Sequence, residues 1–416
     1  MNEYIYKCFD CGINYDKDEV EKNLLYLCPA CGKVEKSQPL KGILLVEHDY
    51  DSIKRKISKK NFFNYELGKF WQYHFLFPLD KSKLDSIPDK LEKITLPSNC
   101  FQKLNYVGQD FFVLNDTNNP TLSFKDRASS LVALKAIELG ITKIAAASTG
   151  NAGSSLAGIC ARLGLESVIF VPKNIPEAKR IQIQSFGAEL VLVDGDYDLA
   201  FDTCLEISSQ KKWYNRNTAY NPLTIEGKKS AAYDIFIAMK NNLPNSIFIP
   251  TGDGVILSGL YKGFSELKEL GWIEKLPRLI SVQAEGSNAF ARFIENKVFD
   301  YVPAASVADS ICAGAPRALY FGAEAIEKSD GSVIVVSDEE ILDAQRITAK
   351  QFGLLLEPSS AAAFAAYKKN TRLMENQNET SLLLFTGNGL KDVFSLSKWN
   401  EKIAPLTPSQ IKDKFF

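Results

Sequence analysis

Four segments of the chain carry lysine, glycine, hydroxyl and amide groups in patterns that could bind a small anionic molecule and move protons. The first segment, NNPTLSFKDRASS, contains Lys125 immediately before Asp126 and Arg127. A lysine amine acts as a base or a nucleophile once it has lost its charge. The plainer interpretation is a surface cation paired with Asp126, and for this segment alone the plainer interpretation is preferred.

The second segment, AASTGNAGSS, follows a short apolar run and opens a predicted helix. It contains Ser148, Thr149, Gly150 and Asn151. Hydroxyl, amide and backbone N–H groups at a helix N-terminus suit a carboxylate or a phosphate, because the helix dipole favours negative charge at that end.

The third and fourth segments place glycines after apolar runs. In IPTGDGVILSGL, Gly252 and Gly254 would let the backbone curl around an anion in front of another helix. In LFTGNGLKD, Thr386 ends an apolar run and precedes Gly387 and Gly389. Glycine-rich turns between strands and helices are common in α/β proteins, so each segment alone fits an ordinary turn equally well.

A different chemistry is indicated at the N-terminus, where two Cys-x-x-Cys pairs are separated by sixteen residues. This spacing is typical of a closed structural zinc site, and a metal would supply folding energy to a module with so little apolar surface. Two unrelated thiol pairs, or a disulfide hairpin, are the alternatives. We expect a structural zinc without a catalytic role, held by Cys8, Cys11, Cys28 and Cys31.

The overall composition excludes several classes of protein. The chain has 416 residues, with 49 basic and 50 acidic side chains and a formal net charge of −1. The length predicts two or three domains. The near-zero net charge gives no excess of positive charge that would attract nucleic acid or an anionic membrane. The N-terminal MNEYIYKCFDCG lacks the apolar core of a signal peptide, and no run approaches the about 20 apolar residues of a membrane span. We therefore expect a cytoplasmic protein.

Two series of short apolar runs alternate with helical patterns, which is typical of parallel sheets with right-handed crossovers. In such sheets ligands bind beyond the carboxyl ends of the strands, where the glycine-rich segments fall. The first series of predicted strands lies at 143–148, 167–171, 189–193 and 213–215, with helices at 152–163, 176–186 and 198–209. The second series lies at 247–250, 279–284, 332–336 and 382–385.

The region between these parts, residues 39–100, contains a basic run at 54–60 and an aromatic-rich stretch at 62–77. Basic and aromatic residues together can bind single-stranded nucleic acid. Because the chain is neutral overall, we prefer a solvated turn followed by aromatic side chains that face the core. The two histidines, His48 and His74, fall in no motif and are interpreted as structural.

In this order, the four segments resemble the fold type II enzymes that use pyridoxal 5′-phosphate (PLP), the tryptophan synthase β family, and within it the threonine synthases. The resemblance covers about residues 100–395. It implies that PTLSFKDRA supplies Lys125 as the lysine that holds PLP as a Schiff base. It also implies a substrate carboxylate loop of Ser148, Thr149, Gly150 and Asn151, with Asn151 also facing the cofactor's 3-hydroxyl. A phosphate cup is implied at Gly252, Asp253, Gly254, Val255 and Ile256, and a partner for the pyridine nitrogen at Thr386.

The resemblance further implies two parallel-sheet α/β domains with PLP in the cleft between them, together with a zinc-ribbon-like module. The expected boundaries are 1–38 for this module and 141–218 for the small domain. The large domain would combine 39–140 with 219–400, and 401–416 would form a tail. A homodimer is expected from the family.

The implied reaction converts O-phospho-L-homoserine and water to L-threonine and phosphate, so the substrate is a small phosphorylated amino acid. Arg127 and Lys228 are the leading candidates for binding it, with Lys229, Arg317 and Lys391 as further cations. Asp126 and Arg127 could instead brace the lysine loop as an ion pair.

Two departures from the family pattern bear on the substrate rather than on the cofactor. Leu122 stands where threonine synthases commonly have glycine, either narrowing the pocket or, as we prefer, pointing into the core. The segment 308–317 also differs from the family. β-Replacement on a serine derivative and dehydration of serine or threonine therefore remain as alternatives, as does a non-catalytic zinc-ribbon binding protein on a degenerate PLP scaffold.

Overall fold

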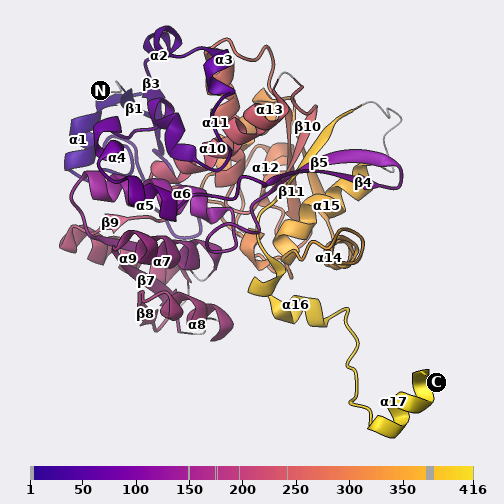
Figure 1. Ribbon diagram of the computed structural model, residues 1–416. Helices are drawn as coiled ribbons and strands as arrows, with labels where there is room; N and C mark the ends of the chain where they lie inside the picture. Colours follow the sequence, from indigo (N-terminus) through magenta and orange to yellow (C-terminus); the bar gives the residue numbers. More distant parts are fainter. Residues whose placement is uncertain are drawn as a thin grey trace.

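The computed structural model describes residues 4–415 apart from 149, 174, 176, 196, 241 and 372–378. The described strands form three β-sheets, and Figure 1 shows the small parallel sheet and its helices set beside the larger one. Within these residues, no helix is both long and apolar enough to cross a membrane.

The smaller α/β unit is the parallel sheet β8–β7–β6–β9. Its strands are Lys143–Ala147 (β6), Glu166–Pro172 (β7), Glu189–Val193 (β8) and Tyr214–Asn215 (β9). They connect through Asn151–Leu163 (α7), Glu177–Ser185 (α8) and Tyr197–Lys211 (α9). These elements confirm the predicted first series. Side chains of alternate residues in β6 and β7 face α7 on one side and α9 on the other, so both faces are buried.

The larger sheet has the strand order β12–β11–β10–β13–β5–β4. It contains the predicted second series as Ser246–Pro250 (β10), Arg278–Ala284 (β11), Ser332–Val336 (β12) and Ser381–Phe385 (β13). Two strands were not predicted, Phe101–Tyr106 (β4) and Gln109–Asn115 (β5). They form an antiparallel hairpin at the edge, and β5 pairs in parallel with β13.

Both faces of the large sheet are apolar, which explains why its strands have continuous rather than alternating hydrophobic sequences. In β10, Ile247 and Ile249 pack toward Leu223–Met239 (α10) and Val255–Glu269 (α11), whereas Phe248 packs toward Pro358–Thr371 (α15) on the other face. In the part of the chain that the structure describes, the sheet is thus covered by helices on both sides, and the loops at its ends remain for ligands.

The cysteine-containing module is built on the antiparallel sheet β2–β1–β3, formed by Tyr4–Cys8 (β1), Asn14–Asp16 (β2) and Leu44–His48 (β3). The strand β3 lies beyond residue 38, where the sequence placed the end of the module. His48 is buried beside Glu226 and Glu266, where Lys229 already supplies a cation to both carboxylates. His48 is therefore part of the packed core, which agrees with a structural role.

The aromatic stretch faces the core, as predicted. Phe62, Phe70, Tyr73 and Phe77 are fully buried, and Phe62 packs against Trp272 with the ring centroids 4.9 Å apart. The short helices of this region are Tyr50–Lys56 (α2), Lys59–Phe62 (α3), Phe70–Leu76 (η1), Lys81–Asp85 (α4) and Pro88–Lys93 (α5). The remaining helices are Lys17–Lys22 (α1), Lys125–Glu138 (α6), Ala289–Asn296 (α12), Asp309–Ile311 (η2), Leu319–Lys328 (α13), Asp338–Phe352 (α14), Gly389–Lys391 (η3), Val393–Ser397 (α16) and Pro408–Phe415 (α17).

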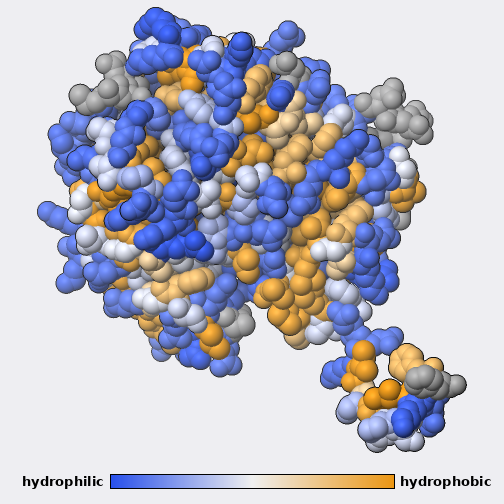
Figure 2. Space-filling model, viewed as in Figure 1, coloured by the Kyte–Doolittle hydropathy of each residue, from blue (hydrophilic) through white to orange (hydrophobic). Residues whose placement is uncertain are grey.

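The C-terminal helix α17 lies apart from the body on an extended segment (Figure 1). Figure 2 shows apolar side chains gathered on this tail. Ile403, Leu406, Ile411 and Phe415 are all exposed there, and none of the described α17 residues is buried.

Leu122 has a left-handed backbone conformation, with φ of 64°, and it does not line the cavity described below. A Cβ atom in this region costs about 1–2 kcal/mol, whereas glycine adopts it freely but loses about 0.5–1 kcal/mol through the entropy of its unfolded state. We therefore expect Leu122→Gly to be about 0.5–1 kcal/mol more stable than Leu122→Ala in urea denaturation. An alanine variant that matches or exceeds the glycine variant would contradict a strained backbone here.

Candidate active site

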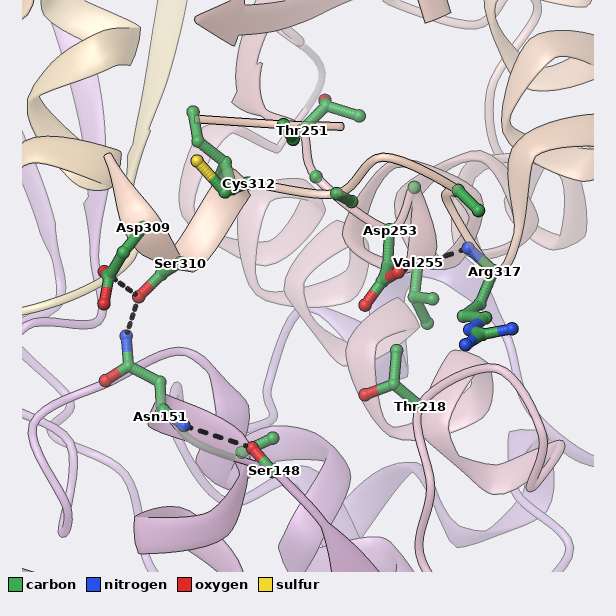
Figure 3. Close-up of a pocket in the computed structure, with 18 of the residues that line it drawn as sticks. Ser148, Asn151, Thr218, Thr251, Asp253, Val255, Asp309, Ser310, Cys312 and Arg317 are labelled. Carbon is green, nitrogen blue, oxygen red and sulfur yellow. Dashed lines mark hydrogen bonds between the residues drawn. The ribbon is translucent and has the colours of Figure 1, made fainter. Parts of the chain in front are cut away.

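A cavity of about 490 Å³ lies where the carboxyl end of β6 in the small sheet meets the carboxyl end of β10 in the large sheet. Residues after β6 and after β10 form opposite walls, and the 309–317 segment lies between them. In Figure 3, Ser148 and Asn151 occupy one side with Ser310 above them, and Asp253 lies beside Arg317 on the other. The cavity therefore brings together residues from three of the four segments singled out in the sequence.

Lys125 is the first residue of α6 and lines the cavity. The preceding residue is fixed by a hydrogen bond from the Phe124 N–H to the Thr386 carbonyl at 2.9 Å. Burial lowers the pKa of the Lys125 amine, and nearby Glu357 opposes this effect. A lysine with a lowered pKa is more often neutral, which is the form that attacks a carbonyl carbon or accepts a proton.

Asp126 and Arg127 do not form the ion pair considered from the sequence. The Asp126 carboxylate accepts hydrogen bonds from the Thr121 hydroxyl at 2.5 Å and the Ser155 hydroxyl at 2.7 Å, and burial raises its pKa. This carboxylate therefore fixes the loop before Lys125 against α7.

The substrate-binding role considered for Arg127 is corrected by its position. Its guanidinium is fully buried and donates to Asp116 at 2.6 Å and to Asp234 at 2.6 Å. It is absent from the cavity lining, because two carboxylates satisfy its charge inside the core of the large unit. Arg127 thus joins α6 to α10.

On the small-sheet wall, the Ser148 hydroxyl caps the start of α7. Its Oγ accepts from the Gly150 N–H at 3.4 Å and from the Gly153 N–H at 3.0 Å. Ser148, Gly150 and Asn151 all line the cavity. Thr149, which the sequence also singled out, lies outside the described residues. The three described members thus form the end of a helix that favours negative charge.

Glu357 is a residue of this region that the sequence reasoning missed. The Asn151 Nδ2 donates to both of its carboxylate oxygens, at 2.8 and 2.9 Å, and also to the Ser310 hydroxyl at 3.2 Å. Burial raises the pKa of Glu357, although Asn151 and Lys391 oppose the rise. Gly387 lies directly beside this carboxylate, and a Cβ on Gly387 would lie 2.2 Å from the Glu357 Oε1, so a larger residue would displace the Glu357 side chain. In the sequence, Glu357 stands alone between the apolar run 354–356 and Pro358, and this pattern could have marked it as a candidate.

On the large-sheet wall, the predicted phosphate cup is a cradle closed around the start of α11. Gly254 has a φ of +80°, and a Cβ on it would lie 2.5 Å from the Phe290 ring. A Cβ on Gly252 would lie 2.8 Å from the Ile311 Cα. Asp253, Val255 and Ile256 line the cavity beside them, so all five residues are together. Free N–H groups at a helix start of this kind bind phosphate.

Cationic side chains in the cavity lining are Lys125, Lys179, Lys228 and Arg317. Lys228 is buried on α10, and its pKa lies well below the usual value, chiefly through burial and secondarily through the charges of Lys125 and Arg216. Lys179, which the sequence reasoning missed, pairs with Asp309 across the cavity mouth.

Two other candidate cations lie away from the cavity. Lys229 is paired inside the core with Glu226 at 2.6 Å, and Lys391 donates to the Thr121 carbonyl at 3.0 Å and to the Ser154 hydroxyl at 3.1 Å. Neither lines the cavity.

Thr386 is buried and does not line the cavity, whereas part of the divergent 308–317 segment does. The Thr386 N–H donates to the Ser360 hydroxyl at 2.9 Å. Ser310, Ile311 and Cys312 line the cavity directly. The segment that differs from the family pattern is thus next to the space for substrate.

The four N-terminal cysteines lie close together, and their sulfur atoms are all within 4.8 Å of one another. The Sγ–Sγ distances are 3.4 Å for Cys8 and Cys31 and 3.6 Å for Cys11 and Cys28. Four thiolates about 2.3 Å from a tetrahedral Zn²⁺ would be about 3.8 Å apart, so the arrangement fits a structural zinc.

The cavity also fits PLP. A lysine with a lowered pKa, Lys125, faces a phosphate cradle in which Gly252 and Gly254 leave no room for a Cβ atom. The amide of Asn151 lies on the opposite wall. This combination of one amine, one anion cradle and one amide is what a phosphorylated pyridine aldehyde requires.

Comparisons with known proteins agree with this arrangement. Residues 96–387 match the family model described as pyridoxal-phosphate dependent enzyme. The threonine synthase of Methanocaldococcus jannaschii is 32% identical over 399 residues, covering 93% of this chain and 92% of that protein. The threonine synthase of Bacillus sp. is 37% identical over 66% of this chain and 76% of that protein.

Solved structures share the fold. Maize serine racemase superposes with a TM-score of 0.63 at 17% identity, covering 80% of this chain and 97% of that one. Threonine deaminase isoform 2 from Solanum lycopersicum gives a TM-score of 0.61 at 20% identity, covering 78% and 94%. The chain therefore belongs to the family of pyridoxal-phosphate-dependent enzymes, as a lyase of fold type II.

Proposed function

We propose that this enzyme converts O-phospho-L-homoserine and water to L-threonine and phosphate. The observation that carries the proposal is the similarity to threonine synthases, which for that of Methanocaldococcus jannaschii covers 93% of this chain. The cavity is compatible with a second phosphate on the substrate. Beside the helix start at Gly254, its lining contains Lys179, Lys228 and Arg317, together with the carboxylates of Asp198, Asp253 and Asp309.

In this proposal Lys125 holds the cofactor and moves the protons. PLP, when bound, supplies an electron sink that stabilises negative charge on the substrate carbon chain. Lys125 removes the proton from Cα of the substrate and later returns one, which its lowered pKa favours. Phosphate leaves from Cγ after a proton is lost from Cβ, a proton is then added at Cγ, and water adds its hydroxyl at Cβ and releases a proton.

The two walls orient the substrate. The start of α7, with Ser148, Gly150 and Asn151, is proposed to bind the substrate carboxylate, because backbone dipoles converge there. Lys228 and Arg317 lie on the opposite side and are proposed to hold anionic phosphate. Holding both ends at once keeps Cα near the Lys125 amine, since orientation of this kind accounts for much of a catalytic effect.

The test is product analysis with the purified enzyme loaded with PLP. O-Phospho-L-homoserine should give threonine and an equal amount of phosphate. O-Phospho-L-serine with sulfite as the nucleophile, L-serine and L-threonine are supplied in parallel. Sulfonated or other replacement products from O-phosphoserine, or keto acids from serine or threonine, without any threonine from O-phospho-L-homoserine, would reject the proposal and indicate β-replacement or dehydration.

Lys228→Met should lower kcat/KM for O-phospho-L-homoserine about 10- to 100-fold, because a hydrogen bond to a charged group contributes about 1.5–3 kcal/mol. Methionine keeps the length and the burial of the side chain but removes the charge. Steady-state kinetics and PLP affinity are measured together, with Lys328→Met on the exposed end of α13 as the matched control. An unchanged KM with weakened PLP binding would assign Lys228 to the cofactor alone.

A further inference from the structure

The cysteine-containing module reaches the active site through one loop. Ser37 lines the same cavity as Lys125 and Gly254, and it has a left-handed backbone conformation with a φ of 56°. The loop that carries it is closed at its base by reciprocal backbone hydrogen bonds between Lys33 and Lys41, at 3.1 and 3.3 Å. A wall of the cavity thus comes from the N-terminal module.

Arg317 forms hydrogen bonds to two backbone atoms of this loop. Its Nη1 donates to the Gln38 carbonyl at 3.2 Å, and its own carbonyl accepts from the Leu40 N–H at 3.1 Å. Its side chain is only 8% exposed. Because both contacts are to the backbone, they depend on the shape of the loop and not on its side chains.

The same arginine contacts the phosphate cradle and the small unit. The Arg317 N–H donates to the Asp253 Oδ1 at 3.2 Å, and the next N–H, of Ala318, donates to the Asp253 carbonyl at 2.9 Å. The Arg317 Nη2 pairs with Asp198 on α9 at 3.1 Å, and its guanidinium lies 4.7 Å from the centre of the Phe201 ring. Figure 3 shows Arg317 and Asp253 side by side.

The base of the loop, in turn, is part of the cysteine cluster. The Cys28 N–H donates to the Gly42 carbonyl at 2.7 Å. Gly42 has a φ of +72°, and a Cβ on it would lie 2.4 Å from the Gly32 Cα. The turn that carries Cys28 and the base of the loop are therefore in close backbone contact. A displacement of one backbone segment would displace the other.

We propose that the N-terminal module completes the active site, and that Arg317 is the positioning residue through which zinc at the four cysteines and PLP at the phosphate cradle stabilise each other. Zinc would fix the position of the turn at Cys28, and this turn is hydrogen-bonded to Gly42 at the base of the loop. The loop in turn is hydrogen-bonded to Arg317 and so keeps it beside Asp253. Energetic coupling between two sites is reciprocal, so PLP must raise the affinity for zinc by the same factor by which zinc raises the affinity for PLP. This inference goes beyond the proposed reaction and does not depend on the identity of the substrate.

The experiment measures the dissociation constant of zinc for the full chain, by competition with a chromophoric chelator, with and without PLP. We expect zinc to bind at least about five-fold more tightly with PLP, in line with ordinary coupling between sites. In parallel, the dissociation constant of PLP, followed by its absorption, should be higher by the same factor after zinc is removed. Equal zinc affinities with and without PLP would overturn the proposal, as would a chain that takes up no zinc.

Arg317→Gln separates coupling from simple destabilisation. If Arg317 transmits the effect, the variant should bind zinc in the same amount but with the same affinity with and without PLP. If Arg317 is only structural, zinc should bind more weakly in both states and the PLP effect should persist, which would contradict the proposal. Arg317→Lys should restore part of the effect, because a point charge can still reach one of the two partners. Arg346→Gln, on an exposed pair with Asp343, is the matched control.

Discussion

Replacing Lys125 with alanine is expected to lower threonine formation at least about a thousand-fold, since positioned proton transfer alone contributes about 10²–10⁴-fold. The same change should abolish the absorption band of lysine-bound cofactor, because no other amine has the place of Lys125 at the start of α6. Lys228 lines the same cavity, but it extends from α10. Product analysis and an absorption spectrum of the purified variant are the measurements.

Two comparisons make this result specific. Lys125→Arg keeps the positive charge but cannot form the covalent link, so it should be as inactive as alanine. Lys328→Met, far from the cavity, should retain both the band and the activity. A Lys125→Ala variant that keeps the band would show that another lysine holds the cofactor, and Lys228 would then be the first to test.

Arg127→Met is expected to destabilise the protein by about 3–5 kcal/mol, because it leaves two buried carboxylates without their cation. Asp116 and Asp234 each accept a hydrogen bond of 2.6 Å from the guanidinium, and all three side chains are buried. The change also disconnects α6, which begins at Lys125, from α10. Urea denaturation followed by tryptophan fluorescence measures the loss.

The control for this prediction is an exposed pair. Arg346 contacts Asp343 at 2.6 Å but is half exposed, so Arg346→Met should cost less than about 1 kcal/mol. If Arg127→Met instead left stability unchanged and raised only KM, the arginine would be a substrate ligand after all.

The parallel strands could be predicted from the sequence because each is a short apolar run bounded by helical patterns or turn residues. The hairpin of β4 and β5 could not be predicted, because its place depends on pairing with β13, more than 250 residues later. Sequence periodicity reports which side chains are buried and not which strand lies next to which.

The candidate site likewise contains residues that local sequence could identify and residues that it could not. Gly252 and Gly254 could be recognised because a cradle around an anion needs a residue without a side chain. Glu357 and Arg317 are defined by contacts between segments that are distant in the chain, with Asn151 in one case and Gln38 in the other. Arg127 was misassigned because the depth of a charged side chain depends on partners such as Asp234 that no local pattern reveals.

The central position of β13 in the large sheet has a consequence for the order in which the protein is made. β13 lies between β10 and β5, so β5 has no parallel neighbour until Ser381–Phe385 has left the ribosome. The sheet of 143–215 has all its strands much earlier. Domains generally fold as units during synthesis, so this smaller sheet should form on the nascent chain. During that time the edge of β5 that later pairs with β13 stays exposed, with unpaired backbone groups. That interval is where a chaperone would be needed.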